Sequence, residues 1–202
     1  KMIYKNQRYL TSSNLKLPSI YGMEFILYGL TSTDLNKDGK GEIVMLDRDY
    51  HLRVYSPSGR LLVKSDEYFG HDPRQIGVGV QIDVDGLVEQ GEPVRFRGRL
   101  EFFRQGKDRY LLLPRNYSAG GSMMPGLAAV DTSGSVAVLR LSRDGLESSF
   151  ETKKQKGYLA AFQVVKARGR YPARLHSAFV EEGAVGGKTV STVYTYSWRD
   201  FR

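Results

Sequence analysis

The feature that most restricts the fold is a repeated alternation of short apolar runs with turns that contain glycine or proline. It is clearest from Gly41 to Ser65, where three such runs follow one another: Glu42–Leu46, His51–Tyr55 and Leu61–Lys64. The middle run alternates polar and apolar residues with the period of two typical of a half-buried strand. Pro57 and Gly59 between the last two runs suit a tight turn. We therefore expect antiparallel strands joined by short turns.

Similar runs recur along most of the chain, and no stretch has a convincing helical period. Further strands are expected at 22–31, 95–104, 109–113, 135–142, 146–152, 158–165, 175–180 and 189–198. They group into three cycles, at about 20–66, 94–153 and 157–199 of one domain spanning 1–202, with a glycine-interrupted excursion at 67–94. Repeated units of this kind predict an all-β protein of the β-propeller type, with about three to four antiparallel blades.

Three cycles are few for a closed propeller. Propellers close with roughly four to eight blades, so three cycles would be a small propeller or the C-terminal part of a larger one. An unpaired sheet edge favours aggregation, so we expect the N-terminal segment 4–17 to complete the last blade.

One loop carries recognisable chemistry. Residues 34–42 read DLNKDGKGE, with oxygen side chains at Asp34, Asn36 and Asp38 and a carboxylate at Glu42. Gly39 permits a sharp turn, and the backbone carbonyl of Lys40 could supply a further ligand. Calcium prefers six to eight oxygen ligands, and this spacing can wrap such an ion. We therefore predict a structural Ca²⁺ site.

Two other kinds of loop share parts of this pattern. An EF-hand loop requires a glutamate at its twelfth position, which here is Met45 within an expected strand. The flanks also do not read as helices, so an EF-hand is rejected. The second alternative is an acidic turn that binds no metal, because aspartate and asparagine also stabilise turns by bonding their own backbone.

The chain resembles the FG-GAP/VCBS repeat family. The resemblance is strongest over 22–66, where YGLTSTDLNKDGKGEIVMLDRDYHLRVYSPSGRLLVKS is similar to one complete bacterial-type blade. It extends toward Trp198 through AFQVVKARGRYPARLHSAFV, which falls where another loop and strand would lie. The resemblance implies a β-propeller whose loop links the first two strands of a blade. It also implies binding or scaffolding at a surface, and it does not imply an enzyme.

The corresponding loops of the later cycles differ from the first. The second is shortened to a plain turn at 104–108. In the third, the ligand positions carry four cations: Lys166, Arg168, Arg170 and Arg174. Calcium cannot bind four cationic side chains. This loop could dock an anion, or it could be a solvated basic surface left after loss of the metal.

Charge and composition limit the function. Lys and Arg total 30 against 22 Asp and Glu, a net charge of +8 that favours anionic partners. Cysteine is absent, which excludes disulfides, thiol nucleophiles and cysteine-ligated metals. No apolar run is long enough to span a membrane. We expect a non-catalytic calcium-binding module for a protein or an anionic surface polymer.

We place this module outside the cytoplasm of a bacterium (periplasm, outer membrane or cell surface), where free calcium would fill a modest site. A polysaccharide-active or polysaccharide-binding enzyme domain with a basic face is the first alternative. Nucleic-acid binding is the second; it would give an affinity that falls steeply with salt.

Overall fold

The computed structural model describes most of the chain beyond its N-terminal segment. The described residues are 29–35, 38–47, 49–70, 75–78, 83–84, 87–88, 92–95, 99–118, 131–142, 145–169, 171–181 and 188–198. Within these ranges the secondary structure is strand, and no helix is present.

The first sheet is a four-stranded antiparallel meander in chain order. Its strands are β1 (Leu30–Thr33), β2 (Glu42–Leu46), β3 (His51–Tyr55) and β4 (Leu61–Tyr68). The turn between β3 and β4 contains Gly59 at a φ of +87°, a conformation that glycine adopts without steric cost.

The central sheet is a second meander of longer strands. It contains β9 (Glu101–Gln105), β10 (Asp108–Ser118), β11 (Asp131–Ser142) and β12 (Gly145–Glu151), and the short β13 (Gln155–Lys156) also pairs with β11.

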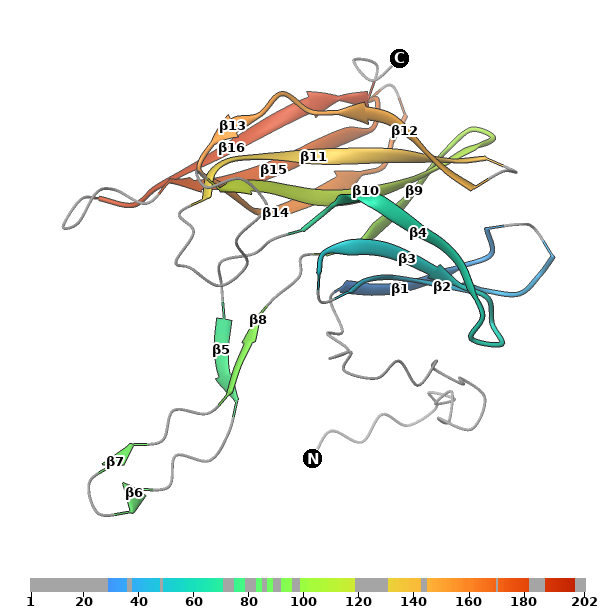
Figure 1. Cartoon of the computed structure of the whole chain (residues 1–202). Coiled ribbons are helices and arrows are strands. Elements are labelled where there is room, and N and C mark those ends of the chain that lie inside the picture. The colour runs from blue at the N-terminus through green and yellow to red at the C-terminus, as the bar shows by residue number, and fades with distance from the viewer. Residues whose placement is uncertain are drawn as a thin grey trace, which may run out of the picture.

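The third sheet has three antiparallel strands in chain order: β14 (Tyr158–Val165), β15 (Arg174–Glu181) and β16 (Val190–Ser197). Two small hairpins lie between the first and central sheets in sequence, and they extend away from the stack (Figure 1). They pair β5 (Gln75–Val78) with β8 (Glu92–Arg95), and β6 (Asp83–Val84) with β7 (Leu87–Val88).

The central sheet packs between the other two (Figure 1). Along β10, Leu111 and Leu113 join a core with the first sheet, whereas Leu112 joins a core with the third. All three leucines are fully buried. Because successive side chains of a strand point to opposite faces, an unbroken apolar run supplies both cores.

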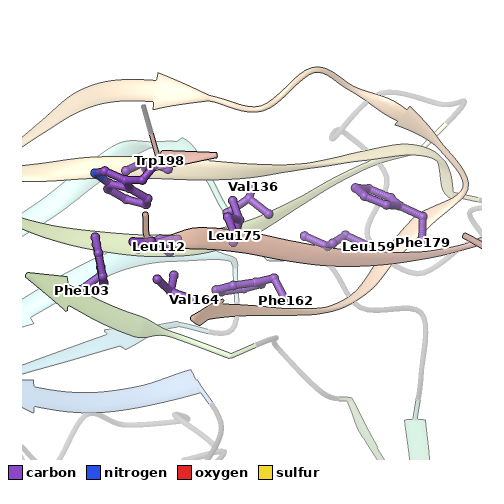
Figure 2. Packing of buried hydrophobic residues seen from close by; sticks show 11 residues of the cluster. Phe103, Leu112, Val136, Leu159, Phe162, Val164, Leu175, Phe179 and Trp198 are labelled. Atoms are coloured by element: carbon purple, nitrogen blue, oxygen red, sulfur yellow. The ribbon is translucent and has the colours of Figure 1, made fainter. Parts of the chain in front are cut away.

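The core between the central and third sheets is built largely from aliphatic and aromatic side chains (Figure 2). Trp198, just after β16, packs against Phe103 with ring centroids 4.3 Å apart and against Tyr110 at 5.3 Å. Its backbone N–H donates to the carbonyl of Ala173 at 2.9 Å. Trp198 therefore fixes the end of the third sheet against the first hairpin of the central sheet.

A close backbone approach also joins these two sheets. The side-chain Oδ1 of Asn116 on β10 accepts a hydrogen bond from the N–H of Leu159 on β14 at 2.7 Å. Gly134 lies beside it on β11, where a Cβ atom would stand 2.6 Å from that same Oδ1 and 2.7 Å from the nitrogen of Leu159. Only glycine leaves room for this contact.

The all-β class and most expected strands are confirmed, including 42–46, 51–55 and 158–165. The expected strand at 95–104 is wrong as a single element: β8 ends at Arg95 and β9 begins at Glu101. Most of the expected strand at 22–31 and all of the closing segment 4–17 lie outside the described residues. The described strands form open sheets and no closed ring or barrel.

Candidate functional site

The acidic loop, residues 34–41 together with Glu42, connects β1 and β2. Thr33 pairs with Glu42 and closes the loop. The Asp34 carboxylate accepts the N–H groups of Asp38 and Gly39, both at 3.1 Å, and Asp38 accepts the N–H of Lys40 at 2.8 Å. Gly39 has a φ of +82°, in the left-handed region that favours glycine. The carboxylates thus organise the turn itself.

Glu42, the first residue of β2, holds the acidic loop against its own strand. Its side chain is 2% exposed, and its Oε2 accepts the N–H of Leu35 at 2.7 Å. From the central sheet, the guanidinium of Arg109 donates to the backbone carbonyl of Asp34. The loop is therefore held both by its own strand and by the neighbouring sheet.

The fit of this loop to calcium can be judged from its donors. Asp34, Asp38 and Glu42 offer carboxylate oxygens, the chemistry that a hard cation requires. Yet no group of three or more histidine or acidic side chains within the described residues is close enough to hold a metal ion. Asn36 lies outside the described residues. The donor types suit calcium, and in this structure Asp34 and Asp38 accept backbone N–H groups of the loop.

The basic loop, residues 166–173 with Arg174, connects β14 and β15. Lys166, Arg168 and Arg174 are exposed, and none forms an ion pair with a carboxylate in the described ranges; Arg170 lies outside them. Arg168 and Tyr171 exchange backbone hydrogen bonds of 3.0 and 3.1 Å across a turn in which Gly169 has a φ of +57°. The turn is ordered by its backbone, which leaves the cations open to solvent.

The acidic and basic loops occupy equivalent places, because each joins the first two strands of its sheet. The matching connection of the central sheet is the short turn between Gln105 and Asp108. The contact of Arg109 with Asp34 joins the acidic loop to this hairpin, and Trp198 joins the hairpin to Ala173 beside the basic loop. The three connections therefore share one end of the stack, hereafter the loop end (Figure 1).

A second polar cluster, the Glu151 network, lies at the opposite end of β10. Glu151 accepts hydrogen bonds from the hydroxyls of Tyr117 and Ser135, both at 2.5 Å, and from the guanidinium of Arg115 at 3.0 Å. Arg115 also donates to Glu67 on β4 at 2.7 Å. The network thus links the first sheet to three strands of the central sheet, β10, β11 and β12.

Titration in the Glu151 network is altered by burial and by these partners. Burial and the hydrogen bond to Glu151 raise the pKa of Tyr117 to about 12. Although burial opposes it, the hydrogen bonds from Ser135 and Tyr117 and the charge of Arg115 lower the pKa of Glu151.

The Glu151 network has the composition of a reactive site but the accessibility of a structural one. Ser135 is fully buried, so its hydroxyl is closed to a substrate. Lys154 lies over the ring of Tyr117, 3.6 Å from the centroid, which covers the phenol by a cation–π contact. We interpret the network as a connection between sheets.

Sequence reasoning missed this network because its members are far apart in the chain. Ser135 and Glu151 come together only through the register of neighbouring strands, which places Arg115 opposite Ser135 and Glu151 opposite Ala137. A pairing of strands was predictable from the sequence, but its register was not.

No family model, curated protein or solved structure matches the chain. Within the described residues, no helix has the length and apolarity needed to cross a membrane.

Proposed function

We propose that the chain is a non-catalytic binding module of the β-propeller type, as the FG-GAP/VCBS resemblance suggests. The support is architectural: meandering sheets follow one another along the chain and pack face to face, as successive propeller blades do. The observation that carries the functional proposal is the shared loop end. An acidic loop from the first sheet and a basic loop from the third lie on the same end of the stack.

In this proposal the acidic loop is a structural calcium site. Its ligands are Asp34, Asn36, Asp38, the carbonyl of Lys40 and Glu42. Calcium, when bound, supplies positive charge that offsets the repulsion among the carboxylates. The chain contributes the turn at Gly39, and the hydrogen bonds of Glu42 to Leu35 and of Arg109 to Asp34 hold the start of the loop.

The basic loop is the proposed contact for an anionic partner, either an acidic protein surface or an anionic surface polymer outside the cytoplasm. Support comes from its exposed cations, which have no described carboxylate to neutralise them, and from the net charge of +8. Exposed charges of one sign raise the rate and strength of encounter with oppositely charged partners, and salt weakens the effect.

Calcium titration tests the site. We expect Ca²⁺ added to chelator-stripped protein to give a calorimetric binding signal and to raise the melting temperature. At a free Ca²⁺ concentration one hundred times Kd, the free energy of unfolding should increase by about 2.7 kcal/mol. Asp34→Ala combined with Asp38→Ala should abolish both signals. The matched control, Asp49→Ala with Asp66→Ala, removes two exposed carboxylates elsewhere and should respond like the unmodified chain. Equal responses from both double variants would show that the acidic loop binds no calcium.

Polymer binding tests the basic loop. Polygalacturonate, an uncharged glucan and a single-stranded oligonucleotide serve as probes at several salt concentrations. Lys166→Ala, Arg168→Ala and Arg174→Ala together should weaken polygalacturonate binding by roughly tenfold or more, since each exposed contact contributes on the order of 1 kcal/mol. Lys64→Ala, Lys153→Ala and Lys188→Ala remove the same charge from other exposed sites as a control. Binding confined to the oligonucleotide would favour the nucleic-acid alternative instead.

A further inference from the structure

The third sheet ends in a strand with unusual edge chemistry. Among the described strands, β16 has β15 as its only ladder neighbour. Its sequence, VSTVYTYS, contains no charge, no proline and no glycine, and eight consecutive residues pair with β15 without a register shift. Val193, near its middle, is 66% exposed, the most exposed large apolar side chain in the described ranges.

The other edges of the three sheets carry the features that normally prevent edge-to-edge association, namely short length, charged residues and bulges. β1 has only four residues. β4, β9 and β12 contain charged residues. β14 has a register shift at Leu159/Ala161, and its Val164 N–H is covered by the Glu101 carboxylate at 3.4 Å. β16 is the exception.

We propose that β16 pairs antiparallel with β16 of a second copy of this chain, through Ser191–Thr195. A two-fold axis at Val193 would place this residue opposite its counterpart, with Ser191 opposite Thr195 and Thr192 opposite Tyr194. Residues opposite each other in an antiparallel pair lie on the same face, so this register joins the inner faces of both sheets into one.

The strand is chemically complementary to itself. Every pair in this register joins hydroxyl, β-branched or aromatic side chains, which are favourable cross-strand partners. No pair sets like charges against each other, although the chain as a whole carries +8. An acidic partner would be expected to face a basic strand, whereas an uncharged strand fits an identical uncharged strand. The segment 4–17, which was expected to complete this blade, carries Lys5, Arg8 and Lys16, whereas a second copy of β16 is uncharged. The second copy is therefore the occupant that this edge fits.

Sedimentation velocity of the full chain over a range of concentrations tests the proposal. We expect a reversible monomer–dimer equilibrium. Val193→Lys, which places a charge on the edge, should give a folded monomer whose melting temperature no longer depends on protein concentration. Val165→Lys changes a residue of the same sheet that is 45% exposed on β14, and it should leave the dimer intact. A monomeric unmodified chain, or a dimer that survives Val193→Lys, would overturn the proposal.

Cross-linking supplies a second measurement that does not depend on tolerance of lysine. The chain has no cysteine, so Val193→Cys introduces the only thiol. Facing residues of an antiparallel pair have Cα atoms about 4.5–5.5 Å apart, within the range that a disulfide spans. Mild oxidation should convert Val193→Cys to a covalent dimer far faster than Val165→Cys. Equal rates for the two variants would contradict pairing through β16.

Discussion

The basic loop and the Glu151 network, which lie at opposite ends of the stack, use charge in opposite ways. At the loop end, the cations of the basic loop are exposed and form no ion pair with a described carboxylate. At the other end, Arg115 is held by two carboxylates, one from β4 and one from β12. The paired charges join sheets that are separate in sequence, whereas the unpaired ones are open to a partner.

This difference follows from what each end must satisfy. A half-buried charge has lost part of its hydration, so it needs several hydrogen-bond partners to be tolerated. Glu151 has three such partners, and all come from the central sheet. An exposed cation keeps its water and stays available for an anion. Variants of the Glu151 network should therefore lose stability, whereas variants of the basic loop should lose binding.

Removing Glu151 should give the largest loss of stability. Glu151→Ala leaves Arg115, Tyr117 and Ser135 without their common acceptor, and Ser135 is fully buried. We expect the free energy of unfolding to fall by roughly 2–3 kcal/mol, the cost typical of leaving buried polar groups unsatisfied. Urea denaturation measures it. Glu147→Ala, an exposed glutamate on the same strand, is the control and should change stability by less than about 0.5 kcal/mol. Similar losses for both variants would contradict the structural role of the network.

The Glu151 network should make the free energy of unfolding fall at both acid and alkaline pH. Because the folded pKa of Glu151 is lowered, its contribution is present above the ordinary value of 4.5 and is lost as the pH falls through the folded pKa. The folded pKa of Tyr117 is raised to about 12, so its contribution is present below 10.0 and is lost between pH 10 and 12.

Unfolding midpoints measured from acid to alkaline pH test these signs. The alkaline loss should amount to about 1 kcal/mol once solvent screening is allowed for, and Tyr117→Phe should remove it, since phenylalanine has no proton to lose. The acid loss should persist in Tyr117→Phe and disappear in Glu151→Gln. An alkaline loss that survives Tyr117→Phe would mean that another group is responsible.

Much of the fold was predictable because it depends on local pattern. The period of two in His51–Tyr55 and the continuous apolar run at Glu42–Leu46 both correspond to strands at those residues. The expected strand at 95–104 failed because its alternation is imperfect and Gly98 interrupts it. What holds the sheets together was not predictable. The contact of Asn116 with Leu159, and the space that Gly134 leaves for it, arise from tertiary packing.

In the acidic loop, too, the sequence predicted some features and not others. The composition of the acidic loop predicts a cation ligand set, and the structure places the loop between the first two strands of a sheet, as expected. Asp34 and Asp38 also accept backbone N–H groups, as the alternative of an acidic turn predicts. The sequence did not reveal that Arg109 from the next sheet holds the loop. Local spacing specifies the donors, whereas the distance between them depends on the fold.

Removing the cations of the basic loop should have the smallest effect on stability. Replacing Lys166, Arg168 and Arg174 together with alanine removes exposed cations that form no ion pair with a described carboxylate. The free energy of unfolding should change by less than about 0.5 kcal/mol in urea, because exposed charges add little to stability. Their loss should instead weaken polygalacturonate binding. If the triple variant were destabilised as strongly as Glu151→Ala, the basic loop would belong to the structural charges, and the distinction between the basic loop and the Glu151 network would fail.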